Sequence, residues 1–528
     1  MKIKHQILNG VEYVYEDQSV WDKEKRYSTH KRKYIGKMVD GVFVPNKRYQ
    51  LEQELEEEKK RGPKPNIKTS RLFGGATYLF DQLGEQLGIR DDLKTCFPKQ
   101  WKQILSVAYF LVLEQNNSFS RFPKWAKTHE HPYGKELSSQ RLSELLGGIT
   151  EEQKQEFFRR QIKRRSETEY LAYDTTSISS YSQVLKQVKY GHNKEDKILP
   201  QINLAMVYGE ESRLPVYYRK LAGNISDVKT ITQLLRQLDQ MRMTKVRLVM
   251  DRGFYSRANI NELMKKHYSF LIGLKRSLQL SKNLIKKLGP QLLKRSNYLS
   301  DEQVYALSCR ESWDYTESKA RSGEVIHEQR RVYLHLYYND LQAAQDRLKF
   351  QKLLDQLERE LLDGDRCPEH EALYEKYYEV KETKVRGVKV TAKEEAIAEK
   401  MSRCGYFILM SNHIQDSAEA LKIYRLKDVI EKAFGNIKER LNGRTTTVSS
   451  EENLDGKLFV QFIALMYLSQ VQKVMNERHL FRKYTTDELL DELDIIECYR
   501  EPKRKAVYGE MTQKQSDLYA YFNVTPPR

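Results

Sequence analysis

Two aspartates in this chain stand where an apolar segment stops, a position that suits metal chemistry. Asp174 ends the short apolar run YLAYD, and Asp251 directly follows the apolar run VRLVM. Two carboxylates a few ångströms apart repel each other unless a cation lies between them. Carboxylate oxygens are hard ligands that favour Mg²⁺ or Mn²⁺. If the fold brings the two aspartates together, we expect them to share a divalent cation.

A third carboxylate, Glu431, lies in the segment 421–441, whose apolar residues recur with helical spacing and predict one helix. On a helical wheel they form one stripe: Leu426, Ile430, Ala433, Phe434, Ile437 and Leu441. Tyr424, Lys427 and Lys438 fall within about 40° of Glu431 on the adjacent uncovered arc. Taken alone, this arc could be an ordinary solvated face. The alternative is a functional site, in which a phenol and two ammonium groups flank the carboxylate of Glu431.

The elements that must position the two aspartates follow the order β-β-β-α-β-α-β. The predicted strands cover residues 170–174, 201–208, 214–219, 246–250 and 269–274, and the helices begin near residues 227 and 257. This is the order of a ribonuclease-H-like fold, which places the ends of its first and fourth strands side by side. Each aspartate alone could be a turn or cap residue. The two together, in this order, favour a paired site.

The composition points to a polyanionic partner. The chain of 528 residues has 91 Lys and Arg against 73 Asp and Glu, a formal net charge of +18. A basic surface gains free energy when it releases counterions from a phosphate backbone. A membrane-surface protein could be equally basic, but the apolar runs 104–113 and 458–468 are too short or too interrupted to span a bilayer. We therefore expect no membrane association.

Other sequence features exclude several classes of enzyme. The five cysteines are scattered without a CxxC pair, which indicates a reducing compartment and argues against a zinc ribbon. The patterns GxxxxGK[ST], HExxH and GxSxG are absent from the sequence, so P-loop, zincin and serine-hydrolase chemistry have no support. The amino-terminal residues lack the apolar run of a signal peptide. We expect a cytoplasmic protein.

The predicted fold class is α/β, a ribonuclease-H-like core that a large insertion interrupts, with helical regions before and after it. Six regions are expected. They are a basic β-module and Pro-rich linker (1–70), a helical region that is a candidate for DNA binding (71–165), the first part of the core (166–275), the insertion (276–403), the second part of the core with the Glu431 helix (404–450) and a carboxy-terminal helical region (451–528).

At these residues the chain resembles the DDE transposases of bacterial insertion sequences, of the IS4-like group and its long-chain IS1634-like relatives. The matching pieces are YDTTSISSYS around Asp174, the stretches LPQINLAMVY and LPVYYRKLAGNISD, and VMDRGFYS around Asp251. The last piece is the spacing Y-x2-R-x3-E-x6-K of the group. Lys427 stands where the pattern has Arg, so the charge is kept but the bidentate guanidinium fork is not.

The resemblance implies roles for the residues of these motifs. Asp174, Asp251 and Glu431 would hold two Mg²⁺ or Mn²⁺ ions, and displacement at phosphorus would follow. Contacts to transposon-end phosphates would come from Tyr424, Lys427 and Lys438, with Arg252 and the region of Asn224 and Asp227 as further candidates near the strand ends.

The resemblance also implies an activity and its partners. The expected activity is metal-dependent cleavage at the transposon ends of double-stranded DNA, followed by strand transfer into target DNA, by a homodimer in a synaptic complex. Two alternatives stay open at this point. One is a ribonuclease-H-like nuclease that cleaves without joining, and the other is a transposase-derived DNA-binding protein without catalysis.

Overall fold

The computed structural model describes residues 2–528 with gaps at 23–26, 61–69, 116, 165–168, 183, 192–198, 242, 244, 319–324, 384–386, 442, 447, 449 and 502–505. The chain divides into two compact units. The first unit comprises residues 1–70 with 500–506, and the second comprises 71–499 with 507–528. The predicted Pro-rich linker, residues 62–66, lies outside the described residues.

The first unit is built on an antiparallel sheet whose four strands follow each other in chain order. The elements are β1 (Lys2–Leu8), β2 (Val11–Asp22), β3 (Tyr27–Val39), β4 (Val42–Pro45) and the helix α1 (Lys47–Lys60). Asp40 and Gly41 connect β3 to β4 with φ of 51° and 79°, and a two-residue hairpin turn needs such positive values. Asp40 and Gly41 are thus the two residues of a tight hairpin turn.

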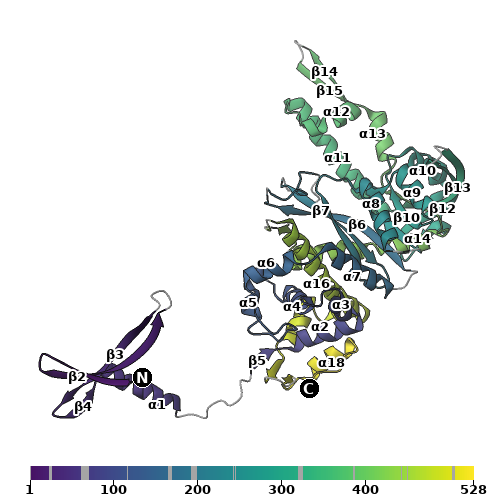
Figure 1. Cartoon of the computed structure of the whole chain (residues 1–528). Helices are drawn as coiled ribbons and strands as arrows, with labels where there is room; N and C mark the ends of the chain where they lie inside the picture. Colours follow the sequence, from purple (N-terminus) through teal and green to yellow (C-terminus); the bar gives the residue numbers. More distant parts are fainter. Residues whose placement is uncertain are drawn as a thin grey trace. The chain divides into compact units, whose positions relative to one another are not determined.

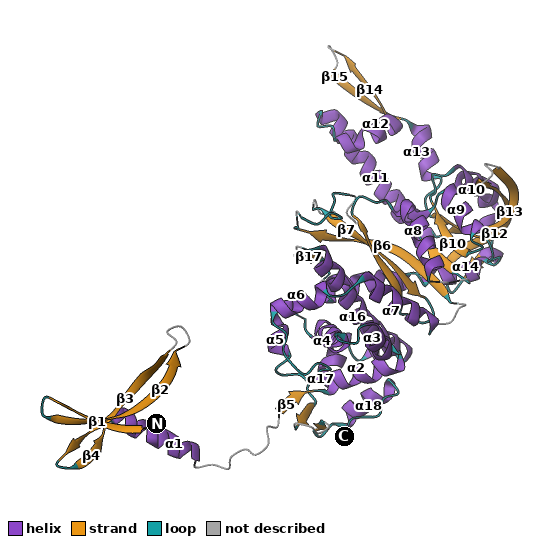
Figure 2. Ribbon diagram, viewed as in Figure 1, coloured by secondary structure: helices purple, strands orange, loops and turns teal. Residues whose placement is uncertain are grey.

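The second unit is mixed α/β, and a large mixed sheet lies at its centre (Figures 1 and 2). One end of this sheet has the strand order β8-β7-β6-β9-β10. The elements are β6 (Tyr170–Ser180), β7 (Gln201–Gly209), β8 (Pro215–Ala222), α8 (Asp227–Gln240), β9 (Arg247–Met250), α9 (Arg257–Lys265) and β10 (Ser269–Leu274). The predicted chain order β-β-β-α-β-α-β is confirmed. Every residue of β7 is buried, as in a strand that is covered on both faces.

One strand from the second part of the predicted core and three from the predicted insertion extend this central sheet. β16 (Tyr406–Ser411) lies between β10 and β13 (Val325–Tyr338), antiparallel to both. β12 (Val304–Ser318) and β11 (Tyr298–Leu299) continue the sheet beyond β13. The helix α10 (Gln279–Leu292) packs against β12 and β13.

The remaining elements of the insertion project from the sheet and share an apolar cluster of their own (Figure 2). They are the helices α11 (Asp340–Asp363), α12 (Glu371–Tyr377) and α13 (Glu394–Met401) and the hairpin of β14 (Tyr378–Thr383) and β15 (Gly387–Ala392). Phe350, Leu357 and Tyr377 lie in this cluster.

A helical body packs beside the sheet around one long helix, α16 (Glu451–Glu477). The other helices are α2 (Gly75–Gln86), α3 (Ile89–Cys96), α4 (Trp101–Leu113), α5 (Phe122–Trp125), α6 (Ser139–Gly147), α7 (Glu151–Lys163), α17 (Thr486–Asp494) and α18 (Gln513–Tyr521). Within the described residues, α16 alone is long and apolar enough to cross a membrane, and 83% of its most apolar window is buried in the protein. It packs on α4 and α6, so its apolarity has a partner in the core.

The prediction of one continuous helix from Leu421 to Leu441 is wrong. The segment forms α14 (Ser417–Arg425), α15 (Asp428–Gly435) and a π-helical turn, η5 (Asn436–Arg440). The N–H of Leu441 donates to the carbonyl of Asn436, five residues earlier, at 3.0 Å. Five of the six stripe residues are buried nevertheless, and the sixth, Leu426, is half-buried at the break between the helices. Burial of the stripe therefore depends on the apolar pattern and not on an unbroken helix.

The prediction that the first strand ends at Asp174 is also wrong. β6 continues to Ser180, because residues 174–179 pair with β7 from Met206 back to Gln201. It is the neighbouring strand, β9, that stops beside Asp174.

Candidate active site

Two adjacent parallel strands bring Asp174 and Asp251 to neighbouring positions. β6 pairs with β9 in parallel, and the last paired residues are Tyr173 and Met250. Asp174 follows Tyr173 and Asp251 follows Met250, and both aspartates are half-buried. Asp174 accepts a hydrogen bond from the backbone N–H of Thr175 at 2.7 Å. The sheet register thus places Asp174 and Asp251 at neighbouring positions at the point where β9 stops.

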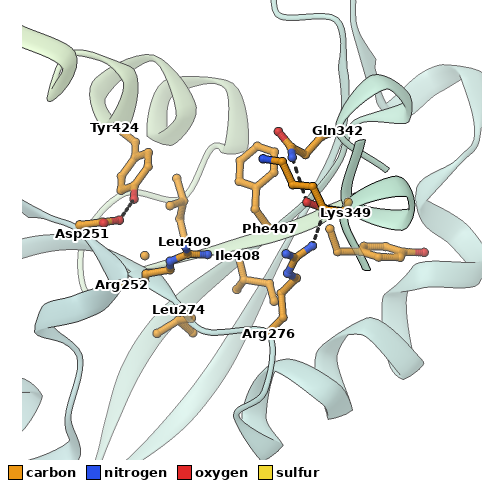
Figure 3. A pocket seen from close by; sticks show the side chains of 13 residues that line it. Asp251, Arg252, Leu274, Arg276, Gln342, Lys349, Phe407, Ile408, Leu409 and Tyr424 are labelled. Atoms are coloured by element: carbon orange, nitrogen blue, oxygen red, sulfur yellow. Dashed lines mark hydrogen bonds and ion pairs between the residues drawn. The ribbon is translucent and has the colours of Figure 1, made fainter. Parts of the chain in front are cut away.

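Tyr424, at the end of α14, reaches Asp251 across 173 residues of sequence. Its hydroxyl donates to Oδ1 of Asp251 at 2.8 Å (Figure 3). Burial raises the pKa of Asp251, but the charge of Lys427, the N–H of Arg252 and the Tyr424 hydroxyl outweigh it, so the net shift is downward. Burial, together with the charge of Asp251, raises the pKa of Tyr424 well above its usual value. The phenol therefore stays protonated and donates to an ionised carboxylate.

Gly273, in the middle of β10, makes room for this contact. A Cβ at residue 273 would lie 2.9 Å from the hydroxyl oxygen of Tyr424 and 3.1 Å from the backbone nitrogen of Arg252. Real Cβ atoms scarcely ever approach other heavy atoms below 3.0 Å. The glycine in the run SFLIGL therefore allows the tyrosine to approach the strand, a common reason for glycine inside a strand.

Glu431 enters the same region on α15, which packs on β6 and β7. Oε1 of Glu431 accepts from Nζ of Lys427 at 2.8 Å, and the two side chains are 56% and 17% exposed. Burial lowers the pKa of Lys427, but the hydrogen bond to Glu431 and the charges of Asp251, Glu431 and Asp174 together raise it. Lys427 is thus the ion-pair partner of Glu431, and the negative charges of Asp251 and Asp174 also act on it.

The donor set at this point suits a divalent metal ion. Three carboxylates act on one cation, Lys427, and carboxylate oxygens are the ligands that Mg²⁺ and Mn²⁺ prefer. Within the part of the chain that the structure describes, no three His, Cys, Asp or Glu side chains are already arranged as a metal-ligand group. The residues therefore fit a metal by the chemistry of their oxygen donors.

The two other predicted site residues lie at the borders of this region. Arg252 follows Asp251 and begins the 3-10 turn η2 (Arg252–Phe254), where it is exposed. Lys438 is half-buried in η5. A π-helical turn advances by less than 100° per residue, so the wheel that placed Lys438 near Glu431 does not apply beyond Gly435.

A further carboxylate, Asp227, lies next to the pair of aspartates. It is the first residue of α8, and its Oδ1 accepts from the hydroxyl of Thr175 at 2.5 Å. The sequence indicated Asp227 only as a candidate near the strand ends, and it missed Thr175 and Gly273. The signal for Gly273 was available, since glycine is unfavourable inside a strand without a structural reason. Nothing local marks Thr175 as the partner of Asp227.

Comparison with known proteins bears on the whole of this region. The family model described as "Transposase DDE domain" matches residues 165–467, which contain β6, β9, α15 and all the residues above. No curated protein matches the chain.

One solved structure, a cryo-EM structure of a piggyBac transposase synaptic complex with hairpin DNA, is similar at 9% sequence identity and a TM-score of 0.34. The similarity covers 64% of this chain and 54% of that chain, so the matched part spans about half the length of the solved chain. A likeness this slight supports no residue-level comparison. The family match covers more than half of the 528 residues, and the chain therefore belongs to the family of transposase DDE domains.

Proposed function

We propose that this protein is a DDE-type DNA transposase, of the IS4-like group with its long-chain IS1634-like relatives. It would cleave double-stranded DNA at the ends of a mobile element and transfer the freed ends into target DNA. The observations that carry this proposal are that β6 and β9 place Asp174 and Asp251 at adjacent positions and that Glu431 pairs with Lys427, within a match to the transposase DDE domain.

In this proposal the core is a ribonuclease-H-like fold, and the three carboxylates hold two Mg²⁺ or Mn²⁺ ions. When bound, such ions would lower the pKa of the attacking hydroxyl or water and stabilise the leaving oxygen. The strand order β8-β7-β6-β9-β10 and the oxygen donor set support this assignment. Tyr424 is a positioning residue, because its hydroxyl donates to Oδ1 of Asp251 and leaves Oδ2 for other contacts.

Lys427 has two roles in this proposal. In the protein without metal it neutralises the carboxylates. Its ammonium would be released from them when divalent ions bind, and it would then contact the phosphate that is cut. Arg252, exposed beside Asp251, and Lys438 would bind neighbouring phosphates of the same DNA. A lysine at position 427 offers a point charge in place of the flat guanidinium fork of the family pattern.

The proposed partners are the two DNA ends of the element and the target DNA. The formal net charge of +18 supports a polyanionic partner. We further propose that a homodimer assembles on paired ends, and that the protein acts in the cytoplasm.

The test is a cleavage and strand-transfer assay with purified protein, Mg²⁺ and duplexes that carry the terminal sequences flanking the gene. Asp174→Asn, Asp251→Asn and Glu431→Gln keep the shape of each side chain and remove its charge. Each should abolish cleavage while DNA binding, measured without metal, stays within about twofold. Glu439→Gln, an exposed carboxylate on the next turn, is the matched control and should cut normally.

The outcomes separate the transposase from its two alternatives. Joined products in addition to cut ends support the transposase. Cleavage without joining, with 3′-hydroxyl ends supplied, would identify a nuclease. DNA binding without any cleavage by the unaltered protein would identify a DNA-binding protein, and full cleavage by any of the three variants would refute the assignment of that carboxylate.

A further inference from the structure

A hollow of about 450 Å³ opens directly beside Asp251 and Tyr424 (Figure 3). One wall is β16, and the opposite wall is α11 of the insertion, which contributes Gln342, Asp346 and Lys349. A second hollow of about 270 Å³ lies further along α11. Arg276, Asp346 and Lys349 line both hollows, so the two adjoin. We call them together the α11 groove.

Cationic side chains outnumber carboxylates along the α11 groove. Its six cations are Arg252, Arg276, Lys349, Lys376, Lys400 and Arg403, and its two carboxylates are Asp251 and Asp346. The carboxylate of Asp251 belongs to the candidate active site. The groove therefore starts at the proposed scissile phosphate and continues over a surface of positive charge.

Asp346 does not pair with the other cations of the groove, because its carboxylate oxygens already accept hydrogen bonds from other groups. It is ion-paired with Arg276, and it accepts from the N–H of Gly405 at 3.2 Å and from the amide of Gln342 at 3.0 Å. Its pKa is lowered, since these donors outweigh its burial. This carboxylate serves to hold Arg276 against α11.

The ion pairs along the groove involve its arginines, because Arg276 pairs with Asp346 and Arg403 pairs with Glu399. Lys349 and Lys400 make no ion pair with any residue for which the structure gives a position. The pKa of Lys400 is lowered by burial and then by the like charges of Arg276 and Arg403. Crowded charges of one sign raise the free energy of a protein unless counter-charges are bound. A chain of phosphates would supply them.

The lining of the groove also includes apolar and aromatic side chains, and these favour single-stranded DNA over duplex DNA as its ligand. Phe407, Ile408 and Leu409 of β16 line the first hollow, and Phe350 and Leu353 of α11 line the second. Phe407 is held by a face-to-face stack on Tyr337, with ring centroids 4.6 Å apart. Duplex DNA turns its backbone outward and keeps its bases stacked inside. A single strand offers unpaired bases to aromatic side chains and phosphates to cations.

We propose that the α11 groove binds a single DNA strand that continues from the scissile phosphate. Lys349, Lys400 and Arg276 contact its phosphates, and Phe407 contacts a base. The identity of the phosphate at Asp251 rests on the proposed function, whereas binding of a single strand by the groove is testable without any cleavage.

The test compares two DNA probes in fluorescence anisotropy with the full chain, in EDTA, over a range of KCl concentrations. One probe is a blunt duplex, and the other is the same duplex with a single-stranded oligo-dT extension. We expect the unaltered protein to bind the extended probe more tightly. The double variant Lys349→Ala/Lys400→Ala should lose this advantage, about tenfold in Kd. Its slope of log K against log salt should fall by about 1.4, since each phosphate contact to a single strand contributes about 0.7.

A second variant tests the aromatic floor separately. Phe407→Leu should weaken binding of the extended probe with no change in the salt slope, because a stack carries no charge. The matched control is Lys352→Ala/Lys286→Ala, which removes two exposed lysines from α11 and α10 outside the groove. It should leave the difference between the probes unchanged.

Three results would overturn the proposal. They are equal affinity of the unaltered protein for both probes, an equal loss for both probes in the Lys349/Lys400 variant, and a preference for the extended probe that survives in that variant. An equal loss would identify a site for duplex DNA instead. Since no catalysis is measured, these results are independent of whether the protein cuts or joins DNA.

Discussion

Replacing Lys427 with methionine removes a charge from the centre of the candidate site and keeps the long, unbranched side chain. Nζ of Lys427 lies 2.8 Å from Oε1 of Glu431, and the charges of Asp251 and Asp174 also act on it. Without metal, Lys427→Met leaves three carboxylates with no shared cation. We expect the metal-free variant to be less stable than the unaltered protein.

The structure limits the size of this effect. Glu431 is 56% exposed, so its ion pair alone contributes only about 0.5–1 kcal/mol. Asp251 is half-buried, and the loss of a nearby cation there adds a similar amount. The expected total is about 1–2 kcal/mol, below the upper range of about 3 kcal/mol for hydrogen bonds to charged groups.

Mg²⁺ should reverse the loss, because it takes the place of the missing cation. If removal of the competing ammonium tightens metal binding tenfold, saturating Mg²⁺ should add about 1.4 kcal/mol more stability to the variant than to the unaltered protein. The assay is the thermal midpoint in EDTA and across a Mg²⁺ titration. Lys432→Met, exposed on the same helix, is the control and should behave as the unaltered protein.

The result that refutes this reasoning is a Lys427→Met variant with an unaltered midpoint in EDTA and an unaltered response to Mg²⁺. The ammonium would then not be the counter-charge of the carboxylates. A variant that is destabilised in EDTA but does not recover in Mg²⁺ would separate the two halves of the argument, because the carboxylates would need Lys427 without holding a metal.

Two further predictions concern a strand glycine and a buried ion pair. Gly273→Ala should displace the Tyr424 hydroxyl from Asp251, since the new Cβ would lie 2.9 Å from the hydroxyl oxygen. A hydrogen bond to a charged group contributes about 1.5–3 kcal/mol, so DNA cleavage should fall tenfold or more. The control Gly435→Ala has open space around the new Cβ and should cleave DNA normally. His129 donates to Asp494 at 3.0 Å, which raises the pKa of His129 against the effect of burial. The pair should stabilise the fold fully below about pH 6.5, and its contribution should be lost as pH rises through the raised pKa of His129. If the thermal midpoint falls with rising pH by the same amount in His129→Gln as in the unaltered protein, this reasoning is wrong.

Much of the core was readable from local patterns. A buried strand needs a short apolar run, so the order of strands and helices around Asp174 and Asp251 followed from the sequence. The apolar stripe near Glu431 also predicted burial correctly for Ile430 and Phe434. These features depend on which side chains leave water, and that preference is a property of each residue and its spacing.

The sequence alone determined the candidate carboxylates and the strand order that makes two of them neighbours. Only the tertiary structure decided which side chains contact these carboxylates. It breaks the predicted helix after Arg425, so that Tyr424 reaches Asp251 from one helix while Glu431 comes from the next. It also brings α11 beside the site to form the groove. Such contacts join residues 173 positions apart for Tyr424 and Asp251 and 70 positions apart for Arg276 and Asp346, and a local pattern does not identify so distant a partner.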